Sequence, residues 1–158
     1  MRLWHQSLIP YLDRQRLLGQ HRECAALRGK GWGKKHATVD YVFHSPYATA
    51  HLVAYHGLVM DEMTRRGYHP DETWYDCDYR GTTLGTEDAW CDLEWAQDLH
   101  EKASISKDII YWQHHNDEYL KECIALLKEK EAPIDWEQVE RGLAFEICNV
   151  EFNSGLRQ

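Results

Sequence analysis

No apolar run in this 158-residue sequence approaches the length of a membrane-spanning helix. The longest apolar stretches, such as Gly57-Leu58-Val59-Met60, fall far short of the roughly 20 residues that a bilayer requires. A charged Arg2 and the polar stretch 5–7 open the chain, unlike a secretory signal. We therefore expect a soluble, cytoplasmic protein with no membrane partner.

The sequence also lacks paired cysteines, repeats and low-complexity tracts. Its five cysteines are odd in number and widely spaced, and no C-x-x-C pair suggests a zinc site or thiol redox chemistry. We expect reduced thiols, no metal and no cofactor. Without repeats, a chain of this length is expected to form one domain over residues 1–158 and to act as a monomer.

Positive charge is scarce overall but concentrated in one half. The net charge is −8, which argues against a nucleic-acid partner, because DNA affinity rests on lysines and arginines. Residues 1–66, however, hold ten Lys/Arg against five Asp/Glu, or +5, which leaves −13 for the remainder. We therefore expect a basic catalytic half over 1–67 and an acidic helical half over 68–158. A solvated acidic half that serves only solubility is the alternative.

Apolar periodicity and capping residues predict a mainly α, compact fold. The predicted helices span residues 10–27, 45–66, 86–100, 116–130 and 135–147. Ser45-Pro46 and Gly67 mark the ends of the second helix, and Asp135 with Gln138 forms a capping pair for the last. Residues 68–86 are expected to form a loop with a turn at Arg80-Gly81, and 101–115 are ambiguous.

A glycine-rich, cationic segment follows the first predicted helix. Residues 29–36 read Gly-Lys-Gly-Trp-Gly-Lys-Lys-His, which favours neither helix nor strand and exposes backbone amides beside positive charge. We interpret it as a basic loop. Contact with nucleic acid and a plain surface turn are both open readings of it.

The first 70 residues resemble the pyrimidine-dimer DNA glycosylase (phage endonuclease V) family. The resemblance rests on Arg2 beside the first residue, the triplet His21-Arg22-Glu23, the pair Ser45-Pro46 and the stretch 65–68, Arg-Arg-Gly-Tyr. The opening Met-Arg-Leu-Trp-His is similar to a bacterial branch of that family. The family's basic, aromatic C-terminal tail has no counterpart in the rest of the chain.

The resemblance implies a helical fold of the endonuclease V type and a DNA repair enzyme. Family members attack C1′ of a damaged nucleotide with the α-amine of the first residue, form an imine and cleave the strand by β-elimination. By this resemblance the catalytic groups are Met1 and Glu23, and the substrate is damaged double-stranded DNA. The expected DNA-binding residues are the cations, the histidine and the tryptophan of the basic half: Arg2, His21, Arg22, Arg28, Lys30, Trp32, Lys34 and Lys35.

Three departures from the phage enzymes concern the substrate more than the fold. Those enzymes expose a threonine after methionine removal, whereas Arg2 is too large for ordinary removal, so we expect Met1 to stay. Arg16 replaces a histidine, and Ala26 replaces an arginine for which Arg28 is a loose substitute. Two alternatives remain open: a non-catalytic nucleic-acid or protein binding module with the same fold, and a metal site built from His5, His21 and Glu23.

Overall fold

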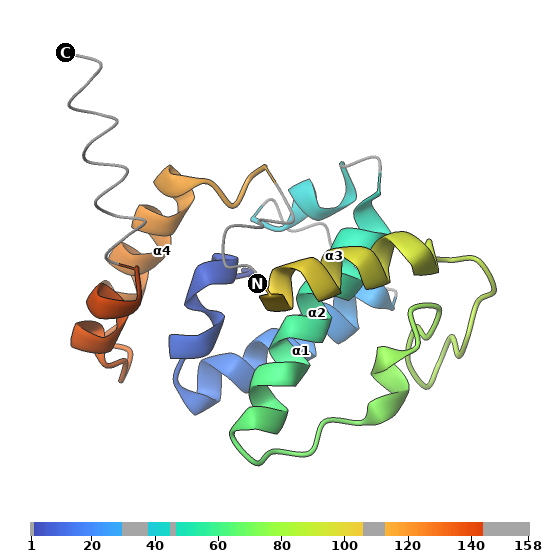
Figure 1. Ribbon diagram of the computed structural model, residues 1–158, viewed down its shortest axis with the longest axis horizontal. Coiled ribbons are helices and arrows are strands. Elements are labelled where there is room, and N and C mark those ends of the chain that lie inside the picture. The colour runs from blue at the N-terminus through green and yellow to red at the C-terminus, as the bar shows by residue number, and fades with distance from the viewer. Residues whose placement is uncertain (1, 30–37, 45–46, 106–112, 144–158) are drawn as a thin grey trace.

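The helices α1, α2 and α3 form the centre of the protein. The computed structural model describes residues 2–29, 38–44, 47–105 and 113–143. Within these ranges α1 spans Arg14–Arg28, α2 spans Ala48–Arg65 and α3 spans Leu93–Ile105. Figure 1 shows α2 passing between the other two, in contact with both. The predicted mainly α fold is confirmed, and no strand is present in the described ranges.

A fourth helix and a short 3-10 helix complete one side of the molecule. The 3-10 helix η1 spans Gln6–Tyr11, and α4 spans Asp117–Glu129. In Figure 1 α4 lies beyond η1, on the side away from α3. One buried apolar cluster joins these parts, since it contains Leu3 and Leu8 from the N-terminal segment and Leu120 and Leu127 from α4.

The second helix forms largely as its sequence predicts. Leu52, His56, Val59 and Met63 are buried and face the core at the expected spacing. The helix ends where Gly67 adopts a φ of +88°, which lets the amide of Tyr68 donate to the carbonyl of Met63. The predicted cap at Ser45-Pro46 lies outside the described residues.

The first and third predicted helices begin too early. Residues 10–27 are interrupted at Leu12, whose extended backbone ends η1, and α1 then begins after Asp13, which occupies the N-cap position. The third helix starts at Leu93 rather than at 86, because the side chain of Asp92 accepts from the amide of Trp95. Ala89, with a φ of +60°, keeps the preceding residues out of a helix.

The loop between the halves contains the predicted turn and one short 3-10 helix, η3, which spans Glu72–Tyr75. Another 3-10 helix, η2, spans Asp40–Phe43 and lies between α1 and α2. A bridge between Tyr79 and Thr86 encloses the predicted turn, in which Gly81 has a φ of +101°. Residues 136–143 are helical, and Asp135 accepts from the amide of Gln138 as the capping pair predicts. No helix of the described residues is long and apolar enough to cross a membrane.

Candidate active site

The carboxylate of Glu23 binds the backbone of the N-terminal peptide. The amide nitrogen of Arg2 donates to Glu23 Oε2 at 3.2 Å. The side-chain amide of Gln20, one turn earlier on α1, donates to the carbonyl of Arg2 at 2.9 Å and lies 3.3 Å from the same carboxylate oxygen. The first peptide units of the chain are therefore fixed against α1 beside a carboxylate.

The next two residues of the peptide are held by side chains from three helices. Gln20 Oε1 accepts from the amide of Trp4 at 2.9 Å, and the hydroxyl of Tyr55 on α2 donates to the carbonyl of Trp4 at 2.7 Å. The hydroxyl of Tyr119 on α4 donates to the carbonyl of Leu3. We call Gln20, Tyr55 and Tyr119 the N-terminal clamp. All three side chains are buried.

Gln20, like the other two clamp residues, is a site residue that the sequence interpretation missed. Its signal in the sequence is its spacing. Gln20 is a polar residue three positions after Leu17 and four before Cys24, so it lies on the face of α1 that packs into the core. It is 2% exposed, so its amide must be satisfied inside the protein. Its nitrogen faces a carbonyl and a carboxylate, while its oxygen faces an amide and a hydroxyl, which fixes the orientation of the group.

Burial raises the pKa of Glu23. The carboxyl loses part of its hydration in the half-buried site, and this effect outweighs the opposing hydrogen bonds from the Arg2 amide and the Gln20 side chain. A carboxyl with a raised pKa exchanges its proton more readily near neutral pH than an exposed one. Glu23 can therefore serve both as a negative charge and as a proton acceptor.

The side chain of Arg2 is directed toward α4. Its Nη1 lies 3.3 Å from Glu122 Oε1, and its guanidinium lies over the ring of Tyr119 at 5.8 Å from the centroid. Glu122 is exposed, so a DNA phosphate could compete for this cation. In the free protein, however, Arg2 contacts the acidic half of the chain.

Arg22 lies on the outer face of α1. It is exposed and lines a groove of about 430 Å³ with Arg14, Gln15 and Leu18, which share its helix, and with Asp13 and Pro133. Arg14 and Arg22 thus place two cations along one groove. The groove is therefore a candidate phosphate-binding surface.

A chain of three side chains links His21 to the interior. Arg28 donates to Nδ1 of His56 at 3.0 Å, and Nε2 of His56 lies 2.7 Å from Nδ1 of His21. Because arginine only donates, His56 must carry its hydrogen on Nε2 and donate to His21, which leaves the hydrogen of His21 on its own Nε2. Burial lowers the pKa of both histidines, so both rings are neutral near pH 7.

Arg28 is a structural residue, which corrects its predicted role as a DNA contact. It is fully buried, and its guanidinium donates to the carbonyls of Trp74, Asp76 and Tyr79 at 2.7 to 2.9 Å. These bonds, with the one to His56, use both terminal nitrogens of the group. Arg28 therefore holds the loop after η3 against the end of α1 and presents no face to a phosphate.

Several predicted site residues lie outside the described part of the chain. These are Met1, Lys30, Trp32, Lys34 and Lys35. Their predicted roles remain predictions. The base of the predicted basic loop is described: Arg80 donates to the carbonyls of Arg28 and Gly29 at the C-terminal end of α1.

The predicted alternative of a metal site at His5, His21 and Glu23 has little support. His5 accepts from the amide of Ser7 through Nδ1 and donates to the carbonyl of His115 through Nε2, so both ring nitrogens are occupied within the fold. His21 uses Nδ1 for His56. Within the described ranges the potential metal-binding cluster is instead the stretch 76–78, Asp-Cys-Asp, in which Asp76 is exposed and Cys77 is buried.

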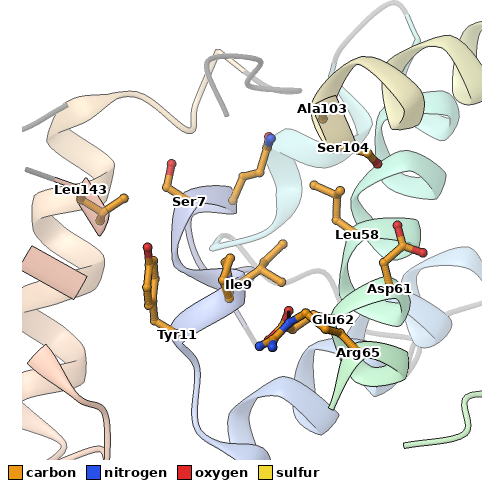
Figure 2. Close-up of a pocket in the computed structure, with 12 residues that line it drawn as sticks. Ser7, Ile9, Tyr11, Leu58, Asp61, Glu62, Arg65, Ala103, Ser104 and Leu143 are labelled. Carbon is orange, nitrogen blue, oxygen red and sulfur yellow. Dashed lines mark hydrogen bonds and ion pairs between the residues drawn. The ribbon is translucent and has the colours of Figure 1, made fainter. Parts of the chain in front are cut away.

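A separate cavity lies between η1, α2 and α3. It has a volume of about 300 Å³ and is lined mainly by apolar side chains, including Ile9, Leu58 and Leu143. Figure 2 shows that Glu62 and Arg65 lie at its rim beside each other, and these two groups form an ion pair. Neither Glu23 nor a clamp residue lines it, so we place the chemistry elsewhere.

The N-terminal half of the chain matches a known family. Residues 1–76, which include Glu23, Gln20 and Tyr55, match the model of the pyrimidine dimer DNA glycosylase family. These residues, 76 of the 158, are similar to the pyrimidine dimer DNA glycosylase family. The resemblance predicted from the sequence is thus confirmed for this stretch. No curated protein and no solved structure gives a significant match.

The stretch that matches the family model contains most of the side chains that bind the N-terminal peptide. The matched stretch contributes the carboxylate and two clamp residues, whereas Tyr119 and Glu122 lie beyond residue 76. The N-terminal peptide of the matched stretch is therefore also bound by α4, which lies outside that stretch.

Proposed function

We propose that this protein is a DNA glycosylase with AP-lyase activity, which acts on pyrimidine dimers or related base lesions in double-stranded DNA. The family match supports the glycosylase class. The observation that carries the mechanism is the hydrogen bond from the Arg2 amide to Glu23. Three covalent bonds separate that amide nitrogen from the α-nitrogen of Met1. Standard bond lengths then keep the α-nitrogen within about 7 Å of the carboxylate, whatever the conformation of residue 1.

An α-amine suits the nucleophilic step. Its ordinary pKa is about 7.7 to 8.0, so a substantial fraction is neutral near pH 7.5, unlike a lysine near 10.4. The neutral amine of Met1 attacks C1′ of the damaged nucleotide, the N-glycosidic bond breaks, and the departing base takes up a proton. Loss of a proton from nitrogen and opening of the sugar ring then give the imine.

Glu23 supports both stages of the reaction. Its negative charge stabilises the cationic sugar while the glycosidic bond breaks, and the carboxylate then accepts a proton from C2′. That proton loss expels the 3′-phosphate by β-elimination and cleaves the strand. Water finally hydrolyses the imine and restores the amine. The raised pKa of Glu23 suits it to return its proton in the later step.

The remaining site residues would bind DNA. A base inside a duplex is inaccessible, so a nucleotide must be expelled from the stack, and a damaged pair costs less to open. Arg22 with its groove, and Lys30, Lys34 and Lys35, would contact phosphates. Trp32 would lie against the minor groove or fill the vacated space. His21 would donate from Nε2 to the substrate.

Borohydride trapping on an abasic-site duplex tests the proposal. Reduction of an imine leaves a covalent adduct, and digestion with mass spectrometry should place the adduct on the α-nitrogen of residue 1. A variant with a short N-terminal extension should give no adduct, and Glu23→Gln should abolish strand cleavage. Binding of the duplex without any adduct would instead indicate a non-catalytic nucleic-acid binding module.

A further inference from the structure

The N-terminal peptide is held by a part of the chain far from it in sequence. The hydroxyl of Tyr119 donates to the carbonyl of Leu3, across 116 positions. Just before α4, the ring of His115 accepts from the amide of Gln6 at 3.1 Å, and the carbonyl of His115 accepts from His5 at 2.8 Å. The residues that make these contacts with the peptide, His115 and Tyr119, lie outside the stretch that matches the glycosylase family.

The contacts from α4 are buried and directional. Leu3 is fully buried and Tyr119 is 4% exposed, so the hydrogen bond between them has no competition from water. The same tyrosine ring lies under the guanidinium of Arg2, which also pairs with Glu122. One face of α4 therefore contacts two consecutive residues of the peptide that carries the α-amine.

We infer that α4 is a working part of the imine-forming site, in which Tyr119 and Glu122 are positioning residues for the α-amine of residue 1. The inference rests on the proposed function. Glu23 and Gln20 hold the peptide from α1, and Tyr119 holds its next carbonyl from the opposite side. The contacts from α1 and from α4 are both needed to fix the direction in which the backbone runs from Leu3 to residue 1.

Small displacements matter for such a nucleophile. A nucleophile accelerates its reaction only when it is held at the reacting carbon, and a shift of about 1 Å can cost on the order of a hundredfold in rate. Release of the Leu3 carbonyl would let the peptide rotate about its bonds to Glu23 and Gln20. The negative charge of the acidic half disfavours DNA binding. Under this inference the acidic half contributes to catalysis by positioning the N-terminal peptide, which requires no contact with DNA.

The first test compares Tyr119→Phe with Tyr75→Phe. Tyr119→Phe keeps the ring and removes only the hydroxyl, so the protein should still fold. Under single turnover with saturating abasic duplex, we expect it to form the borohydride-trapped adduct about tenfold more slowly, with unchanged DNA affinity. Tyr75→Phe removes a hydroxyl that donates to Asp61, away from the peptide, and should keep the wild-type rate. Equal rates for the two variants would overturn the inference.

The second test uses two charge reversals on the exposed surface of α4. Glu122→Lys replaces the partner of Arg2 with a like charge and should slow adduct formation about three- to fivefold. Glu129→Lys makes the same change of net charge on the same helix, at an exposed position near its end. If both reversals slow the reaction equally, the effect is one of net charge and the positioning role fails.

A readout without activity separates this inference from the proposed function. The Trp4 amide, which donates to Gln20, should exchange with deuterium about tenfold faster in Tyr119→Phe than in wild type. Amides of α3 should not change. If the Trp4 amide exchanges faster in the variant but the wild-type protein forms no adduct, the imine mechanism is refuted. The structural role of Tyr119 in the clamp is then still supported. Unchanged exchange with normal trapping would refute the role of α4 alone.

Discussion

The guanidinium of Arg28 donates to Nδ1 of His56 at 3.0 Å, in the interior of the protein. Both side chains are fully buried. The contact matters because it fixes the hydrogen of His56 on Nε2, and through it the hydrogen of His21 on Nε2, the ring nitrogen that does not contact His56. A cation that the sequence suggests for DNA thus orients a neutral histidine instead.

Arg28→Met should therefore destabilise the protein without weakening its DNA contacts directly. The substitution leaves three loop carbonyls and one imidazole nitrogen without their donor, and we expect a loss of roughly 3 to 5 kcal/mol in the free energy of unfolding. Urea denaturation measures this loss. Arg22→Met is the matched control, because Arg22 is exposed: it should unfold like wild type and lose affinity for duplex DNA in a salt-dependent manner.

Because several histidines are buried, we expect acid to destabilise the fold at pH values well above the pKa range of ordinary carboxylates. Burial lowers the pKa of His5 to about 4, and lowers the pKa of His56 and His115 well below 6.5. Between pH 6.5 and 4 the unfolded chain therefore binds protons that the folded chain does not, so stability falls as pH falls. His5 alone should account for roughly 3 kcal/mol of this loss by pH 4.

Urea midpoints at pH 7.5, 6 and 5 check this dependence. His5→Gln should unfold with a shallower dependence on pH, because glutamine has no proton to bind in this range. A midpoint that stays constant between pH 7.5 and 5 would contradict the neutral state of these rings.

The titration of Glu23 gives a third prediction. Because burial raises its pKa, the carboxyl should titrate with a midpoint above 4.5 in the folded protein. Carbon-13 NMR of the labelled glutamate side chain measures the midpoint, and Glu23→Gln identifies the signal by its disappearance. Strand cleavage should decline as pH falls through the same midpoint, since protonation removes the negative charge. A midpoint at or below 4.5 would show that hydrogen bonds outweigh burial.

Local features of the fold could be predicted from the sequence because they depend on near neighbours. The cap at Asp135, the glycine that ends α2 and the buried stripe of α2 each rest on residues a few positions apart. The start of α3 was misplaced because the helix begins where Asp92 accepts from the amide of Trp95, while Asp78 accepts from the amides of Ala89 and Cys91 just before it.

The site was predictable only in part, for a related reason. The importance of Glu23 followed from a family resemblance, but nothing in the local sequence says that Gln20 would bind the backbone of Arg2 and Trp4. The burial of Arg28 depends on carbonyls nearly fifty residues away. Contacts between distant segments carry no periodic signal, so the clamp becomes visible only in the folded chain.

Gln20→Ala should impair both the fold and the chemistry. It leaves the carbonyl of Arg2 and the amide of Trp4 unpaired in a buried place, and we expect a loss of about 2 to 4 kcal/mol in unfolding free energy. Adduct formation on abasic duplex should slow by roughly a hundredfold, because the peptide loses its main link to α1. A variant that is destabilised but traps at the wild-type rate would show that the amide serves only the fold.

Gln20→Glu isolates the electrostatic part of the same contact. It keeps the shape of the side chain but places a second carboxylate where an amide nitrogen now lies 3.3 Å from Glu23 Oε2. Like charges at this distance resist joint ionisation, so the pKa of Glu23 should rise further above its wild-type value. The pH dependence of strand cleavage should move to higher pH, while Gln15→Glu on the exposed face of α1 should leave it unchanged. If both variants moved it equally, the close contact between Gln20 and Glu23 would have no special part in setting the charge of Glu23.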